Sequence, residues 1–115
     1  MTVNRLKFRT YCKLDNTIRA CNTEEDFKLL YDILYNDNED YIILQSTGLL
    51  DKNRKEIFEG DLVKGEYEGE QLIFEVIYKK VSFVLKRGIM TMSFTNVNNI
   101  EIIGNTYKNP ELLEK

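Results

Sequence analysis

The side chains of this sequence that could support chemistry are carboxylates, because the chain contains no histidine. Without histidine, Ser-His-Asp and Cys-His catalysis are excluded, and so is most zinc-dependent hydrolysis. Glu66, Glu68 and Glu70 alternate along the chain, so on one strand they would share a face that could hold a divalent cation. Such a run is more often a solvated edge that discourages pairing between sheets, and we favour that interpretation.

A second pair of carboxylates, Glu59 and Asp61, flanks Gly60. Asp61 is typical of a turn residue whose side chain accepts hydrogen bonds from nearby backbone amides. The glycines at positions 60, 65 and 69 do not form the Gly-rich loop, followed by Lys and Ser or Thr, that binds phosphates. We therefore predict that the protein is not an enzyme, with no catalytic residue, no metal site and no cofactor.

Residues 5–14 alternate between apolar and polar side chains with a period of two, which indicates a half-buried strand. Small β-barrels bind single-stranded nucleic acid with basic faces and stacking aromatic residues, and a basic face also suits an acidic protein surface. The outer face of this strand is our candidate interaction face; it consists of four basic residues and one aromatic residue, namely Arg5, Lys7, Arg9, Tyr11 and Lys13.

A turn at residues 15–16 returns the chain as a second strand over residues 17–21. We prefer a three-residue loop to a two-residue loop, because it pairs Cys12 with Ala20 and keeps one face apolar. Cys21 then lies on the opposite face from Cys12, and in the two-residue alternative the pair would be diagonal neighbours at an awkward distance for a disulfide. We predict that both thiols are reduced and packed.

Residues 23–36 have the pattern of an amphipathic helix. Thr23 and the acidic residues that follow it resemble a capping box. Apolar residues recur at helical spacing along one face, namely at Phe27, Leu30, Tyr31 and Leu34. Leu29 and Ile33 widen this face. A helix this apolar on one side must cover an open sheet face or contact a second subunit, with a groove for a peptide as a rarer alternative.

From residue 41 the chain has the pattern of consecutive short strands separated by turn residues. Gly48 is expected to break the first of these strands, and Pro110 to begin a single helical turn in the tail. Short strands at about ten-residue spacing favour a small barrel or sandwich over a parallel sheet. The expected strands cover residues 41–45, 62–64, 71–79, 81–87, 89–94 and 100–103.

The charge of the chain is unevenly distributed. The net charge of −3 and the pI of about 5.1 give no general attraction to nucleic acid. Residues 5–19 hold five basic residues against one acidic, a balance of +4, whereas residues 22–40 hold one basic against seven acidic, a balance of −6. The two segments face each other, are simply solvated, or recognise partners; pairing between copies would give a symmetric homo-oligomer.

The length of 115 residues and the hydrophobic content of 43% predict a single packed domain. Within it we expect a hairpin and helix over residues 1–40, a β-barrel over residues 41–105 and a tail over residues 106–115. No apolar run approaches the ~18 residues that cross a bilayer, and the first residues lack the apolar region of a signal peptide. We therefore expect a soluble, cytoplasmic protein in a reducing compartment.

Residues 47–63, together with Ile100-Glu-Ile-Ile-Gly-Asn105 and Asn109-Pro-Glu-Leu-Leu113, resemble the YopX-like family of phage and prophage proteins, and Leu6-Lys-Phe-Arg9 fits the family's start. The resemblance implies an all-β core, a barrel of SH3-like character and a place in the host bacterial cytoplasm, but no activity. It implies a structural role for Thr47, Gly48, Asp51, Asn53, Glu59, Gly60, Asp61, Gly104, Asn105 and Pro110.

One position departs from the family pattern. Arg54 stands where relatives have a glycine at the tip of a turn. A left-handed conformation suits glycine there, so Arg54 must either adopt it at a cost or change the turn.

These observations predict a mainly β, non-enzymatic phage accessory protein that acts as a protein-interaction module. Its partner would be a host or phage protein, a second copy of the chain, or both, and we expect no membrane. The alternative is a small β-barrel that binds nucleic acid through basic strand faces, to which Lys79, Lys80, Lys86 and Arg87 would add a second cluster.

Overall fold

The computed structural model describes residues 7–114, and its contacts divide the chain into two units, Met1–Ser46 and Thr47–Lys115. Unit 1 contains β1 (Phe8–Cys12), β2 (Thr17–Ala20), α1 (Glu24–Asn36) and most of β3 (Tyr41–Leu50), which continues into unit 2. Unit 2 contains β4 (Glu56–Phe58), β5 (Asp61–Tyr67), β6 (Glu70–Lys79), β7 (Ser82–Arg87), β8 (Met90–Met92), a 3-10 turn η1 (Phe94–Asn96), β9 (Asn98–Asn105) and a second 3-10 turn η2 (Pro110–Glu114).

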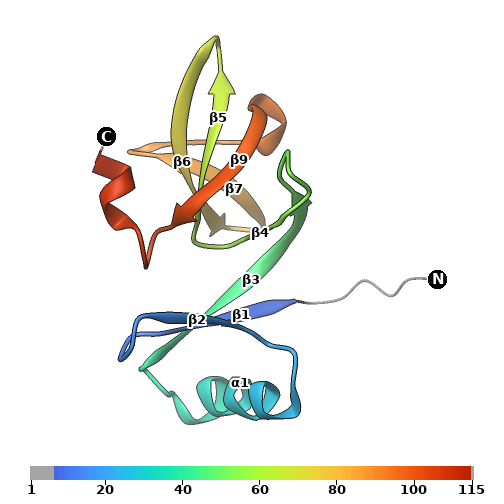
Figure 1. Cartoon of the computed structure of the whole chain (residues 1–115), viewed down its shortest axis with the longest axis vertical. Helices are drawn as coiled ribbons and strands as arrows, with labels where there is room; N and C mark the ends of the chain where they lie inside the picture. Colours follow the sequence, from blue (N-terminus) through green and yellow to red (C-terminus); the bar gives the residue numbers. More distant parts are fainter. Residues whose placement is uncertain (1–6, 115) are drawn as a thin grey trace, which may run out of the picture. The chain divides into compact units, whose positions relative to one another are not determined.

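The predicted mainly β fold, with an N-terminal hairpin and one helix ahead of a small barrel-like sheet, is confirmed (Figure 1). The sequence placed the division of the chain at residue 40, whereas the contacts place it after Ser46. No helix within residues 7–114 is long and apolar enough to span a membrane.

The register predicted for the first hairpin is wrong. Cys12 pairs with Thr17 and Tyr11 with Ile18, so the loop has four residues rather than three or two. The carboxylate of Asp15 accepts hydrogen bonds from the backbone and the hydroxyl of Thr17, at 3.2 and 2.6 Å, and Asn16 adopts a left-handed conformation. These local bonds determine the turn, and Leu14 is left exposed.

The register also corrects the predicted faces of the cysteines. The backbone amide of Cys21 donates to the carbonyl of Phe8 at 3.0 Å, so Cys21 lies on the same face as Cys12. The two are four residues apart along the hairpin, about 13 Å at the rise of a strand, which is too far for a disulfide. Both cysteines are free and half-buried, as predicted. Burial and the nearby Asp26 raise the pKa of the Cys21 thiol, against the effect of Arg19.

The start of α1 is confirmed as a capping box. Thr23 adopts an extended conformation and accepts from the amide of Asp26, while the side chain of Asp26 accepts from the amide of Thr23. The helix ends at Asn36, and Asp37 follows in a left-handed conformation, which glycine, asparagine and aspartate adopt more readily than other residues do. Both ends of the helix therefore follow from local sequence.

Unit 2 is built on a five-stranded antiparallel sheet in the order β8-β7-β6-β5-β9 (Figure 1). Register shifts between β5 and β9 mark bulges, and such bulges increase the twist of a strand and curl a sheet toward a half-barrel. Gly65 lies within this irregular pairing, where an added Cβ would collide with Val97. The concave side encloses the hydrophobic core, formed by Ile57, Val63, Phe74, Val76, Leu85 and Val97.

Several expected strands of unit 2 need correction. Gly48 does not break β3. It takes a left-handed conformation within the strand, and the strand continues to Leu50. The strand expected over residues 89–94 is shorter and covers Met90–Met92, since η1 begins at Phe94, and β9 begins at Asn98, before the expected residue 100. The helical turn expected at Pro110 is confirmed as η2.

Arg54 adopts the conformation that suits glycine, with φ of 66°. A left-handed conformation costs an L-residue about 1–2 kcal/mol, and glycine offsets part of that gain by its greater freedom in the unfolded chain. Arg54→Gly should therefore stabilise the protein by about 0.5–1 kcal/mol, measured by urea unfolding. Arg54→Ala keeps the Cβ atom and should give no such gain; equal effects of the two substitutions would contradict backbone strain as the cause.

Candidate functional site

The motif residues around the turn at residues 51–54 are structural. Asp51 is buried, and its Oδ1 accepts from the backbone amides of Asn53 and Lys55 at 2.8 and 2.9 Å. Its Oδ2 accepts from the amide of Ile102 at 3.0 Å, which joins the turn to β9. Burial alone would raise the pKa of Asp51, but the donors of Ile102, Lys55 and Asn53 together hold it below its ordinary value.

Asp61 and Gly60 form a second structural turn between β4 and β5. Asp61 is 2% exposed, and its Oδ2 accepts from the amide of Phe58 at 2.8 Å, as expected for a turn-capping side chain. The side-chain amide of Asn105 lies 3.4 Å from Oδ1 of the same carboxylate. Gly60 is left-handed, and a Cβ there would meet the ring of Tyr107 at 3.0 Å.

The remaining motif residues lie within β3, between β4 and β5, and from the end of β9 to η2. A Cβ on Gly104 would meet the side chain of Asn109 at 2.8 Å, and Pro110 begins η2. The hydroxyl of Thr47 donates to the carbonyl of Ile57 at 2.8 Å, beside the left-handed Gly48. Glu59 is half-buried between β4 and β5. The motif thus fixes turns and close backbone approaches.

The glutamates that could have shared one strand face do not do so. Glu66 lies in β5, Glu68 occupies the turn with φ of 50°, and Glu70 begins β6. Among residues 7–114 no group of three or more acidic, cysteine or histidine side chains is placed to hold a metal ion.

The predicted interaction face lies on a central strand. Arg5 is outside the described residues. β1 pairs with β2 on one side and β3 on the other, so Arg9 and Tyr11 have apolar neighbours in both strands, among them Ile18 and Leu44. Both are half-buried, and the hydroxyl of Tyr11 donates to Asn16 at 2.9 Å. Lys7 and Lys13 are exposed, and the structure brings these four residues together on one face.

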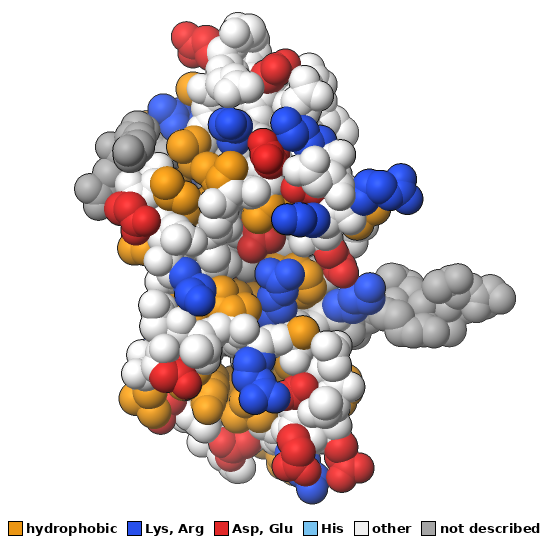
Figure 2. Space-filling model, viewed as in Figure 1, with side chains coloured by type: hydrophobic (Ala, Val, Ile, Leu, Met, Phe, Trp, Pro, Cys, Tyr) orange, Lys and Arg blue, Asp and Glu red, His pale blue; other side chains and the backbone are white. Residues whose placement is uncertain are grey.

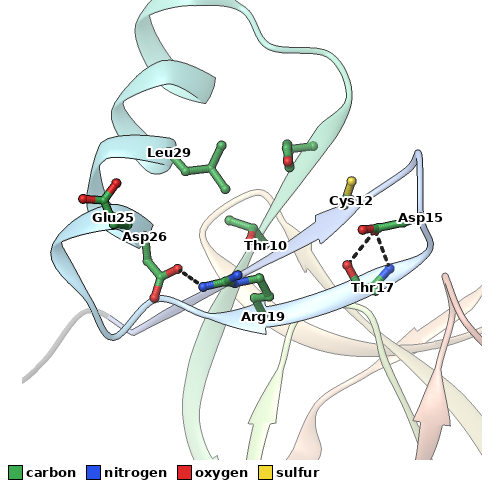
Figure 3. A pocket seen from close by; sticks show the side chains of 9 residues that line it. Thr10, Cys12, Asp15, Thr17, Arg19, Glu25, Asp26 and Leu29 are labelled. Atoms are coloured by element: carbon green, nitrogen blue, oxygen red, sulfur yellow. Dashed lines mark hydrogen bonds and ion pairs between the residues drawn. The ribbon is translucent and has the colours of Figure 1, made fainter.

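No sequence pattern indicated the cavity on the opposite face of this hairpin. It has a volume of about 210 Å³ and lies between α1 and the strands of unit 1 (Figure 3). Its position follows from the hairpin register, which was predicted wrongly and which places Arg19 beside Thr10. The lining residues are Thr10, Cys12, Asp15, Thr17, Arg19, Glu25, Asp26, Leu29 and Tyr41.

One wall of the cavity is an ion pair. Arg19 Nη2 lies 2.8 Å from Asp26 Oδ1, with the guanidinium largely exposed and the carboxylate buried (Figure 3). The backbone amide of Asn22, the side chain and backbone amide of Thr23, and the guanidinium of Arg19 stabilise the charged carboxylate, and together they lower the pKa of Asp26 to about 2. Asp26 therefore stays ionised and holds Arg19 at the cavity.

The other wall carries negative charge. A hydrogen bond with Cys12 raises the pKa of Tyr41, and the charges of Asp15 and Asp40 raise it further. Hydrogen bonds from Thr17 and Cys12 lower the pKa of Asp15, so its carboxylate is ionised. Asp15 is held by Thr17 and Cys12 at this wall, and the charged side chains of the lining can bind and orient a charged group.

The outward side of α1 carries a second group of apolar residues. Leu29, Leu30 and Ile33 are half-buried on its inner side. The α1 outer face consists of Phe27, Tyr31, Leu34 and Tyr35, which are 53%, 61%, 60% and 70% exposed. Three of the four residues of the predicted stripe are therefore exposed, whereas Leu30 packs together with Leu29 and Ile33, which were expected only to widen the stripe.

The α1 outer face is aromatic and has an acidic surround. The rings of Tyr31 and Tyr35 lie 4.5 Å apart with a tilt of 31°. Glu24 and Glu25 are exposed near the start of the helix and share Lys28, at 3.6 Å from each. Figure 2 shows acidic and hydrophobic side chains together at the end of the view where α1 lies in Figure 1. The spacing of Tyr35 four residues after Tyr31 was the signal for this face.

Comparison with known proteins places the whole described chain in one family. The model of the YopX protein family matches residues 5–114. The fold is similar to that of protein EF1440 from Enterococcus faecalis, known from a crystal structure, at 22% identity with a TM-score of 0.67 over 95% of this chain and 98% of that chain. No curated protein matches the chain. The structural match supports the fold alone.

Asp51 provides a test of the structural motif. Asp51→Asn replaces an acceptor oxygen with a donor, so at least one of the three backbone amides loses its partner. Hydrogen bonds to a charged group contribute about 1.5–3 kcal/mol each, and we expect a loss of about 2–3 kcal/mol in urea unfolding. Lys52→Ala removes only an exposed ion pair with Glu101 at 3.4 Å and should change stability by less than about 0.5 kcal/mol. Equal losses would contradict the proposed role.

Asp26 makes the stability of unit 1 depend on pH. Because its folded pKa of about 2 lies below the ordinary value of 3.8, the stabilisation is fully present above about pH 4 and is lost as the pH falls toward 2. Asp26→Asn should lower the melting temperature of the helix signal at neutral pH, and more than half of this difference should disappear by about pH 2. Glu24→Gln removes an exposed carboxylate of the same turn as a control. A difference that is constant with pH would count against this account.

Proposed function

The chain belongs to the YopX protein family, and on that basis we propose that it is a phage or prophage accessory protein that binds another protein in the bacterial cytoplasm rather than catalysing a reaction. The docking surface that we propose is the α1 outer face. The observation that carries the proposal is the exposure of four large apolar side chains on a single helix face.

The α1 outer face has the composition of a binding surface. Burying a large apolar side chain contributes about 1.5–3 kcal/mol, so four of them can supply the central contacts of a specific complex. Tyrosine is enriched at such contacts, because its ring is apolar and its hydroxyl tolerates water. Contiguous exposed apolar patches on soluble proteins mark interaction sites far more often than isolated exposed residues do.

The charge around α1 indicates the chemistry of the partner. The segment of residues 22–40 carries a balance of −6. A partner that accepts this helix needs an apolar groove with a basic rim, because like charges placed opposite each other would oppose docking. This is the arrangement in which an amphipathic helix binds in a groove, with residues at helical spacing as its anchors.

The use of the buried carboxylates supports binding over catalysis. Asp26, Asp51 and Asp61 each accept hydrogen bonds from backbone amides that would otherwise lack partners. A carboxylate committed in this way holds a turn or a helix end and is not available as a general base.

The test is a comparison of three proteins: the natural chain, Tyr31→Ala with Leu34→Ala, and Ile89→Ala as a control. Ile89 is a fully exposed apolar residue in unit 2. Each tagged protein is expressed in a bacterial host and recovered with and without nuclease, and the protein retained by the natural chain is purified and titrated calorimetrically. We expect a stoichiometric complex that weakens with salt, at least about 30-fold weaker binding for the double variant, and no change for the control.

Four results would overturn the proposal. The first is that the α1 variant binds the purified partner as tightly as the natural chain does. Alternatively, the retained material would disappear with nuclease, which would favour nucleic acid and the basic faces. The third result is that the chain forms a complex with itself alone, and the fourth is that it retains no protein at all.

A further inference from the structure

We propose that the cavity between α1 and the strands of unit 1 is a receptor for a cationic side chain, best an arginine, that the binding partner inserts. This inference rests on the proposed function, because it takes the cation to be carried by a protein. It concerns a surface that the α1 outer face does not include, since the cavity lies on the inner side of the helix.

The size of the cavity suits one side chain. Its volume of about 210 Å³ corresponds to roughly seven water molecules, at about 30 Å³ each. Pockets for drug-sized ligands and cofactors start at about 300 Å³. The cavity is therefore too small for a nucleotide but large enough for the planar end of an arginine with part of its stem.

The hydroxyl of Thr10 is a polar group of the cavity lining. Thr10 is 4% exposed and lines the cavity from the middle of β1. A donor placed in the cavity could form a hydrogen bond with this hydroxyl, and Tyr41 lies in the same lining as a second polar residue.

The charge of the lining favours a cation over an anion. Asp15, Glu25 and Asp26 face a single basic residue, Arg19, so the balance is −2. Arg19 and Asp26 pair with each other at 2.8 Å, which leaves the carboxylates of Asp15 and Glu25. Glu25 lies 3.6 Å from Lys28, but both side chains are largely exposed and the contact is weak. An anion would have to compete with Asp26 for Arg19.

A guanidinium fits these acceptors better than a metal ion does. Metal ions need several oxygen ligands around one point, and no group of three or more acidic, cysteine or histidine side chains within residues 7–114 is so arranged. A guanidinium presents five donors in one plane and can reach separate acceptors, here the Thr10 hydroxyl and the Asp15 carboxylate. The raised pKa of Tyr41, to which the charges of Asp15 and Asp40 contribute, agrees with a negative potential at this wall.

The test uses Nα-acetyl-arginine methylamide as the probe and the ¹⁵N-labelled full chain. We expect saturable shifts of the Thr10, Cys12 and Tyr41 amide signals in NMR titration, with a dissociation constant in the millimolar range because a single side chain is a small ligand. Thr10→Val keeps the shape and removes the acceptor, and Asp15→Asn keeps one oxygen for the turn and removes the charge. Each should weaken binding at least fivefold, whereas Thr91→Val, a matched change in β8, should not.

Two further probes define the outcomes. The citrulline derivative has the shape of arginine without the charge, and the glutamate derivative carries a negative charge. If the citrulline derivative binds as tightly as the arginine derivative, the cavity does not select a cation. If the glutamate derivative binds tightly, Arg19 binds anions there and the proposal is wrong. If the arginine derivative causes no shifts, the cavity is not a binding site for it. The titration measures binding in the cavity alone. The Tyr31→Ala, Leu34→Ala variant should therefore still bind the arginine derivative, even if it loses the protein partner, and this separates the inference from the proposed function.

Discussion

The carboxylate of Asp51 is the contact on which unit 2 depends. It accepts hydrogen bonds from three backbone amides at once. Two of these amides belong to its own turn, and the third is that of Ile102 in β9, 51 residues along the chain. The first two bonds form the turn, and the third fixes the turn against the edge strand of the sheet. An exposed edge would offer unpaired backbone groups to other chains, and the backbone of Lys52 also donates to Ile100 at this edge. One buried charge thus organises local and long-range structure together.

The same device, a buried carboxylate that accepts hydrogen bonds from backbone amides, occurs at two other places. Asp61 caps the turn into β5, and Asp26 closes the start of α1 while holding Arg19. In each case burial alone would disfavour the charge, and backbone donors compensate for it. Of the acidic residues that the sequence presents as candidates for chemistry, Asp61 is such a structural cap, Glu59 and Glu66 are half-buried, and Glu68 and Glu70 are exposed.

The sequence predicted features that rest on short-range bonds and missed those that rest on register. The capping box, the role of Asp61 and the turn at Pro110 were predictable because each involves residues within a few positions of one another. The hairpin register was not, since a buried-face argument favoured pairing Leu14, whereas the bonds of Asp15 to Thr17 leave Leu14 in the loop. The cavity depends on that register, because a shift of one residue would turn Arg19 to the other face.

The composition of α1 explains why a partner is the simplest account of unit 1. Among the described residues of unit 1, Leu44 is the one apolar side chain with almost no exposure, whereas the core of unit 2 holds six. A unit with so little burial is marginally stable alone. Yet α1 leaves four large apolar side chains in water, where they add nothing to folding. A ligand that binds only the folded state stabilises it in proportion to the logarithm of its concentration relative to the dissociation constant. A partner on α1 would therefore bury the outer face and stabilise the unit that presents it.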